Sequence, residues 1–277
     1  MNSIQDYRDF YANFIVKSAG SSDERLIAAF ASVQRERFLA EGPWQVFIGS
    51  GYLPTISSDP RLVYQDYLIS LAPDRGINNG QPSLHAACLV ACAPAPGETV
   101  LQIGAGTGYY TAILATLVGQ SGRVIAYEIE TDLAQQASAN LKHFPNVEVI
   151  GASASEGSLP MADLLYVNAG ATHPLPCWLD ALKIGGRLIF PLTPNEAYGC
   201  MLLVTRRSPG SYAALALMRV AFIPCIGARD DTASSALTAT LERQSLKAVR
   251  SLHRGTPPDH SAWVAGEGWW LSSAEPA

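Results

Sequence analysis

The sequence lacks a basic excess, a cysteine pair motif and a long apolar run, and each absence argues against a class of protein. Lysine and arginine number 19 against 24 acidic residues, for a formal net charge of -5. Without a basic excess, the chain has no electrostatic footprint for general binding to a nucleic-acid backbone. It also has no apolar run of the roughly eighteen residues that a membrane-spanning helix needs. We therefore expect neither nucleic acid nor a membrane as a partner.

The five cysteines are scattered along the chain and form no CxxC pair. This pattern predicts free thiols rather than a disulfide framework, and it predicts no metal site. The N-terminal segment carries early acids and lacks the apolar stretch of a secretory signal, so we expect a cytoplasmic protein. Hydrophobic residues make up 48% and charged residues 16% of the chain, a composition typical of a folded domain with a substantial core.

Short apolar segments alternate with helical segments through the middle of the chain. This rhythm predicts a mostly parallel sheet covered by helices on both faces. Residues 200–206 and 213–225 have no helix between them and predict a late antiparallel strand pair. We therefore predict an α/β, Rossmann-like fold with a seven-stranded, mostly parallel sheet. Its first five strands are expected at residues 100–104, 123–128, 147–150, 163–168 and 187–192.

The most informative stretch is IGAGTGYY, which follows one of these strands and opens a helix. Its glycines, Gly104, Gly106 and Gly108, fall where a backbone can approach a ligand closely. A dinucleotide-binding GxGxxG fingerprint has a third glycine that lets the helix pack on the strand. Tyr109 stands at that position here, which argues against NAD(P) or FAD.

An acidic residue, Glu128, ends the next strand. A carboxylate in that place can accept hydrogen bonds from both hydroxyls of a nucleoside ribose. A GxGxG loop followed by an acid at the next strand tip is the pattern of S-adenosylmethionine (AdoMet)-dependent methyltransferases. We therefore predict AdoMet as the cofactor and S-adenosylhomocysteine as the product, with residues 95–226 as the AdoMet-binding core.

Longer segments of the chain resemble the protein-L-isoaspartate O-methyltransferase family. The likeness rests on VLQIGAGTGYYTAILA, on GQPSLHA and on the unit from DLLYVNAG to GGRLIFPL, within a resemblance that runs from about residue 26 to residue 224. The resemblance implies an AdoMet enzyme that methylates the free carboxylate of isoaspartyl residues in damaged proteins. Together, the loop, the acid and the resemblance give a predicted cofactor set of Gly104, Ala105, Gly106, Thr107, Gly108, Tyr109, Glu128, Ile129, Ala152, Ser153 and Asn168.

The chain departs from the family pattern mainly on the acceptor side. The family has a serine or threonine immediately before its Gln-Pro pair, where this chain has Gly80 before Gln81. If the hydroxyl is the missing part, serine at position 80 should raise activity on isoaspartyl peptides. Alternatively, Asn78, Asn79 or Ser83 could supply the lost polar contact, and the sequence does not distinguish among them.

Methyl transfer to a carboxylate requires positioning more than proton transfer. A carboxylate is already ionised at neutral pH and needs no general base. Asp66 lies in the irregular segment before Gln81, and His173 follows the fourth strand, where ligands bind parallel sheets. Either residue could equally be a surface side chain without a catalytic role. The predicted acceptor-side set is Gly80, Gln81, Asn79, Asp66 and His173.

These observations predict an AdoMet-dependent carboxyl O-methyltransferase with N-terminal helices and a substrate-side segment at 1–94 and a C-terminal extension at 227–277. The expected acceptor is a carboxylate on a peptide, a protein or a small molecule. One alternative keeps the fold and cofactor but methylates a peptide aspartate or a biosynthetic small molecule. Another is a catalytically silent AdoMet-binding module. The oligomeric state and the role of the tryptophan-rich tail stay open.

Overall fold

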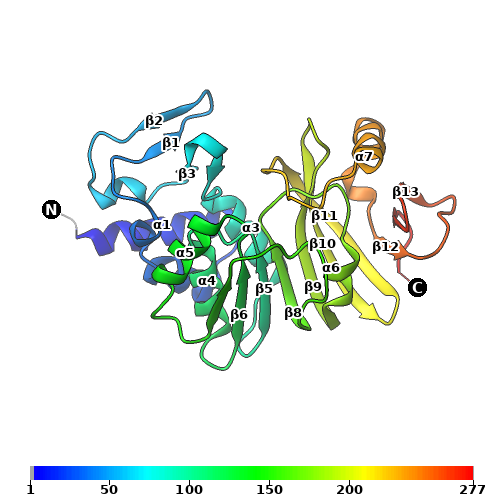
Figure 1. Cartoon of the computed structure of the whole chain (residues 1–277), viewed down its shortest axis with the longest axis horizontal. Helices are drawn as coiled ribbons and strands as arrows, with labels where there is room; N and C mark the ends of the chain where they lie inside the picture. The colour runs from blue at the N-terminus through cyan, green and yellow to red at the C-terminus, as the bar shows by residue number, and fades with distance from the viewer. Residues whose placement is uncertain (1–2, 277) are drawn as a thin grey trace. The chain divides into compact units, whose positions relative to one another are not determined.

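The computed structural model describes residues 3–276. The chain forms two compact units (Figure 1). The first unit contains residues 1–98 and 105–152, and the second contains residues 99–104 and 153–277. The predicted division into three domains stays a prediction.

Helices dominate the first unit, and local signals explain where they begin. Ser3 and Asp6 form a capping box at the first helix, and the Asp23 side chain caps the second. Pro82 occupies the first turn of the third helix, where its missing N–H costs nothing. The helices are α1 (Ile4–Ser18), α2 (Glu24–Ser32), α3 (Pro82–Cys92), α4 (Tyr109–Val118) and α5 (Thr131–Asn140).

The segment predicted to be irregular, 42–80, contains short pieces of regular structure. Two antiparallel strand pairs form, β1 with β2 and β3 with β4. These short pieces and the preceding turn are η1 (Arg35–Phe38), β1 (Gln45–Phe47), β2 (Tyr52–Pro54), η2 (Pro60–Val63), β3 (Ser70–Ala72), η3 (Pro73–Arg75) and β4 (Ile77–Asn78). The first unit also holds a parallel pair, β6 (Arg123–Tyr127) and β7 (Val147–Ile150).

The second unit is built around a mixed sheet with the strand order β13-β14-β12-β11-β10-β9-β8-β5. Strands β5, β8 and β9 run parallel, as predicted from their apolar sequences. The β10–β11 hairpin confirms the predicted antiparallel pair. The elements are β5 (Thr99–Ile103), β8 (Ala162–Val167), α6 (Pro176–Asp180), β9 (Leu182–Leu192), β10 (Gly199–Ser208), β11 (Ser211–Val220), α7 (Asp231–Arg243) and η4 (Leu246–Ala248).

The α/β fold class is confirmed, but the chain has more strands than the seven predicted. The C-terminal segment adds β12 (Ser251–Arg254), β13 (Ala262–Gly266) and β14 (Trp269–Ser272), and β12 pairs antiparallel with β11. The antiparallel part is therefore larger than predicted.

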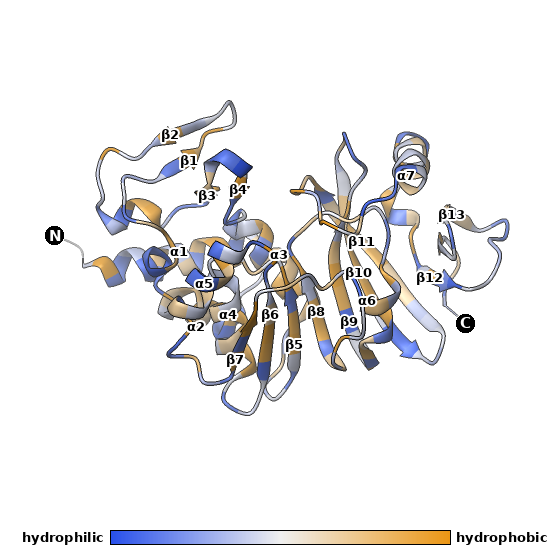
Figure 2. Cartoon of the chain, in the orientation of Figure 1, coloured by the Kyte–Doolittle hydropathy of each residue, from blue (hydrophilic) through white to orange (hydrophobic). Residues whose placement is uncertain are grey.

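The tryptophans of this C-terminal segment pack inside the second unit. Trp263, Trp269 and Trp270 are at most 6% exposed, so the tail is part of the folded unit. Apolar residues colour the strands of both units in Figure 2, in keeping with the buried cores. Across residues 3–276, no helix is both long and apolar enough to span a membrane.

Candidate active site

The glycine loop joins β5 to α4 in a conformation that only glycine adopts easily. Gly104, Gly106 and Gly108 have φ values of 78°, 57° and 97°, in the left-handed region. At Gly108, a Cβ atom would also lie 2.7 Å from Cδ1 of Leu141. Close packing and backbone conformation therefore both require a glycine there.

The Glu128 carboxylate lies beside this loop in the first unit. The residue is 6% exposed. Its Oε2 accepts the Gly106 N–H at 2.6 Å, and its Oε1 accepts the Glu130 N–H at 3.0 Å. A carboxylate offers roughly four lone-pair sites, so each oxygen can still accept one hydroxyl. The neighbouring Ile129 side chain is 42% exposed and offers an apolar contact beside that carboxylate.

Burial raises the pKa of the Glu128 carboxyl, and the N–H donors of Glu130 and Gly106 offset part of that rise. The acid therefore takes up its proton at a higher pH than the ordinary 4.5 of a glutamate. Because only the ionised form accepts two ribose hydroxyls fully, we expect AdoMet affinity to weaken as pH falls through this raised pKa. Calorimetry at successively lower pH should show the decline, whereas Glu128→Gln should give a flatter profile.

Asn168, in the second unit, provides a polar group next to the start of the loop. Its Nδ2 donates to the Gly104 carbonyl at 3.0 Å. Its Oδ1 is buried and has no hydrogen-bond partner within residues 3–276. A buried acceptor without a partner is costly, and a donor such as the AdoMet ammonium group would satisfy it. The role of Asn168 in cofactor binding stays a prediction.

Other predicted cofactor residues contribute backbone or packing rather than free side chains. The Ala105 N–H donates to the Tyr127 carbonyl at 3.1 Å, and the Thr107 hydroxyl donates to the carbonyl of Phe38. The Tyr109 side chain is 3% exposed, and its hydroxyl lies 3.3 Å from that of Tyr11. The side chains of Thr107 and Tyr109 thus pack in the first unit, and the predicted cofactor roles of these two residues stay predictions.

Ala152 and Ser153 follow β7 and are both exposed. The Ser153 hydroxyl lies 2.7 Å from that of Ser155. Their proposed place near the adenine stays a prediction.

On the acceptor side, the structure brings Asp66 and Gln81 together. Asp66 Oδ2 accepts from Gln81 Nε2 at 2.9 Å and from the Ser83 hydroxyl at 2.6 Å. Asp66 Oδ1 accepts the Ser83 N–H at 2.8 Å. Asp66 therefore caps the start of α3 and orients Gln81. Both carboxylate oxygens are engaged, as expected for a reaction that needs no general base.

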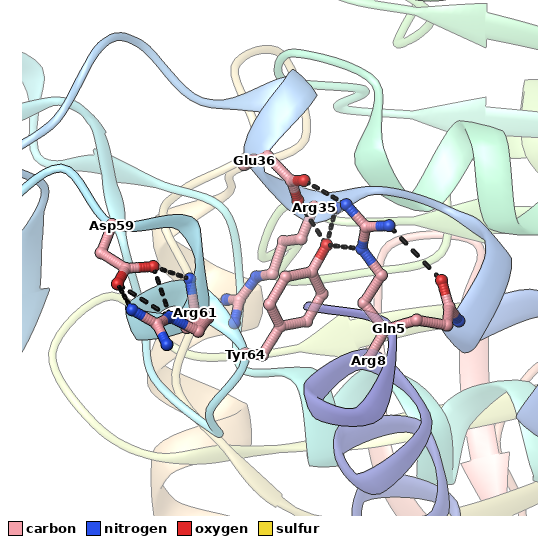
Figure 3. Close-up of polar contacts among 7 residues, drawn as sticks. All are labelled: Gln5, Arg8, Arg35, Glu36, Asp59, Arg61 and Tyr64. Carbon is pink, nitrogen blue, oxygen red and sulfur yellow. Dashed lines mark hydrogen bonds and ion pairs between the residues drawn. The ribbon is translucent and has the colours of Figure 1, made fainter. Parts of the chain in front are cut away.

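A buried arginine, Arg35, holds the segment that carries Asp66, and Figure 3 shows Arg35 together with Tyr64 of that segment. Its guanidinium donates to the carbonyls of Val63 and Gln65 at 2.7 Å and of Tyr67 at 2.8 Å. Arg35 was not among the residues that the sequence predicts for the site. The available signal was an arginine between apolar positions, Val33 and Phe38, both of which are also buried.

His173 lies in the second unit, after β8. Its Nδ1 is 3.0 Å from the Thr172 hydroxyl, which also accepts the N–H of Asp230 just before α7. Burial lowers the pKa of this imidazole from its ordinary value, which favours the neutral form. These contacts account for His173 as a structural neighbour of the α7 start, and its catalytic role stays a prediction.

Gly80 has no room for a side chain. An added Cβ would lie 2.2 Å from Nε2 of His85, and the His85 ring is stacked on Tyr110 with centroids 3.6 Å apart. His85 is 2% exposed, and burial lowers the pKa of its imidazole to about 3. A neutral, immobilised ring therefore fills the place where the family's hydroxyl would branch from the backbone.

Because His85 fills this space, the expected effect of serine at position 80 on stability and activity differs from the effect that the sequence predicts. We expect Gly80→Ser to destabilise the protein by about 2–4 kcal/mol, from left-handed strain plus overpacking, without a gain in activity on isoaspartyl peptides. Gly76→Ser is the matched control, because Gly76 has φ 66° and no atom within 4 Å of an added Cβ. Thermal melting should show a clearly larger loss for Gly80→Ser. Equal losses would mean that His85 yields easily.

The segment that carries Asp66, Gly80 and Gln81, here called the acceptor segment, contacts the glycine loop and α5 within the first unit. A Cβ at Gly106 would lie 3.3 Å from Cδ1 of Leu71, which is in β3. Arg75, which ends η3, binds Asp132 in α5 through bonds of 2.9 and 2.6 Å and also pairs with Glu130. The hairpin that leads to Gly80 is thereby fixed beside the loop and Glu128.

Together, the strand–glycine loop–helix unit and the buried acid define an α/β nucleoside-binding enzyme of the methyltransferase class. Comparison with known proteins identifies the family. The profile of the protein-L-isoaspartate(D-aspartate) O-methyltransferase (PCMT) family matches residues 14–230. The chain belongs to this family, which confirms the resemblance seen in the sequence.

Individual relatives agree with this assignment. The chain is 30% identical over 216 residues to a protein-L-isoaspartate O-methyltransferase of Koribacter versatilis, covering 76% of this chain and 87% of the relative. It is 32% identical to one of Rhodopseudomonas palustris, covering 76% and 80%.

Solved structures share the fold. One protein-L-isoaspartate O-methyltransferase superposes with a TM-score of 0.66 at 24% identity, covering 84% of this chain and 69% of the other. A second, described as a candidate member from Plasmodium falciparum in complex with S-adenosyl-L-homocysteine, gives a TM-score of 0.64 at 18% identity, covering 79% and 98%. The predicted methyltransferase fold is confirmed.

Proposed function

We propose that this protein is an AdoMet-dependent O-methyltransferase that esterifies the free carboxylate of isoaspartyl residues in peptides or proteins. The observation that carries the proposal is the buried Glu128 carboxylate, which lies beside the glycine loop and accepts the Gly106 N–H. Family membership supplies the reaction class. We expect the enzyme to work in the cytoplasm.

The residues of this chain would bind and orient the reactants. Glu128 and Ile129 would hold the ribose and adenine side of AdoMet. When bound, AdoMet supplies an electrophilic methyl group. Both oxygens of Asp66 are engaged with Gln81 and Ser83, so this carboxylate positions the segment rather than removing a proton. A carboxylate, which is already ionised at neutral pH, is the acceptor that suits such a segment.

The glycine at position 80 favours considering a second class of methyl acceptor. Gly80 lacks the family's hydroxyl and His85 fills its space, so a different carboxylate, such as a peptide aspartate, could be preferred. The cofactor site is the same in both cases.

A methyl-transfer assay tests the proposal. Protein, AdoMet labelled in its methyl group and a peptide with one isoaspartyl residue should yield a base-labile methyl ester. The same peptide with a normal aspartate is the control and should react far more slowly. If only the aspartyl peptide were esterified, the protein would instead be a methyltransferase of the second acceptor class, which acts on a peptide aspartate. AdoMet binding without any ester would reject carboxyl methylation.

A further inference from the structure

Three polar side chains flank Gly80 and could replace the missing hydroxyl, and two of them are already engaged. The Oδ1 of Asn78 accepts the Gly80 N–H at 2.9 Å, and its side chain also bonds to Tyr52. The Ser83 hydroxyl donates to Asp66 at 2.6 Å. Neither side chain can bind the methyl acceptor without breaking a hydrogen bond that it already makes within the segment.

The third, Asn79, has a donor to spare. Its backbone N–H donates to the Ile69 carbonyl at 2.9 Å, and its Oδ1 accepts the Ile69 N–H at 2.9 Å. Because the Ile69 N–H can only donate, the Asn79 amide must present Oδ1 to it. The orientation of the amide is therefore fixed by chemistry, and Nδ2 is the group that faces elsewhere.

That Nδ2 atom is buried without a hydrogen-bond partner in the described part of the chain, and the residue is 8% exposed. A buried N–H without a partner destabilises a protein, and a catalytic role or a bound ligand is one reason why such a group is kept. The position fits the reaction, because Asn79 immediately precedes Gly80 and Gln81. It also bonds to Ile69, two residues before the Leu71 side chain that contacts the Gly106 position.

We propose that Asn79 Nδ2 binds the carboxylate of the methyl acceptor, in place of the hydroxyl that the family carries at position 80. This inference rests on the proposed function. Nδ2 donates to one carboxylate oxygen and leaves the other free to attack. That oxygen forms the O–CH₃ bond as the S–CH₃ bond of AdoMet breaks, and the bonding pair passes to sulfur. The products are a methyl ester and S-adenosylhomocysteine, and no proton is transferred.

Asn79→Asp tests the assignment, since it retains an oxygen for the Ile69 N–H and replaces only the donor. We expect KM for an isoaspartyl peptide to rise about tenfold or more, while AdoMet affinity stays near the wild-type value. Asn78→Asp is the matched control: it introduces the same charge one residue away and retains the acceptor for Gly80, and it gives up only the bond to Tyr52. Its KM should change less than about threefold.

Two results would overturn the inference: a wild-type KM for Asn79→Asp, or equal rises in KM for both aspartate variants. If Asn79→Asp does not fold, Asn79→Ser, which also lacks the amide donor, must show the same rise. The wild-type assay separates this inference from the proposed function. A wild-type protein that methylates no carboxylate removes both, whereas wild-type activity with an unaffected Asn79→Asp removes only the role of Asn79.

Discussion

Arg35→Met is expected to lower the free energy of unfolding by about 3–5 kcal/mol. The guanidinium is fully buried, and it donates to three carbonyls of the 63–67 segment. It also lies 5.8 Å from the ring centroids of Tyr11 and Tyr109. Methionine fills much of the volume but leaves three carbonyls of this segment without their donor. Urea denaturation of the variant and the wild type measures the difference.

Arg61, shown in the same close-up (Figure 3), is the matched control. It forms an ion pair with Asp59 at the surface, with a side chain 42% exposed. Arg61→Met should leave the denaturation midpoint unchanged within error, because water replaces that partner readily. If Arg35→Met were as mild as Arg61→Met, the buried guanidinium would not be what holds the Asp66 segment.

Glu128→Ala is expected to weaken AdoMet binding about 10- to 100-fold, the loss of one or two hydrogen bonds to a buried carboxylate. The substitution also removes the acceptor of the Gly106 N–H and so loosens the loop. Isothermal titration measures the change directly.

Glu148→Ala serves as the control for Glu128→Ala. Glu148 lies on the adjacent strand β7, pairs with Arg123 and is 49% exposed at its side chain. Its removal subtracts the same charge without touching the loop, so AdoMet affinity should hold. Equal affinity in wild type and Glu128→Ala would remove that residue from the cofactor site.

The cofactor side could be predicted from sequence because its signals are local. A buried strand, a glycine-rich turn and the next strand tip lie within one stretch of chain, and the parallel β6–β7 pair forms as the apolar pattern indicates. At Gly108, the sequence motif predicts only part of what the structure shows. Its φ follows from the motif, but its contact with Leu141 depends on how α5 packs.

The acceptor side could not be predicted in the same way, because its contacts join residues distant in sequence. Asn78 and Asn79 are chemically identical, and only the pairing with Ile69 distinguishes them. The sequence predicts that serine at position 80 raises activity, whereas in the structure His85 occupies the space that the side chain would need. The three C-terminal strands were missed because they are short and only their pairing with β11 and with one another defines them.

The most direct test of the account is calorimetric titration of the intact protein with AdoMet and, separately, with NADH. The glycine loop with Tyr109 at its end and the Glu128 carboxylate predict one AdoMet per chain and no heat from NADH. Binding of NADH, or no binding of AdoMet, would contradict the assignment of the loop and, with it, the proposed methyltransferase activity.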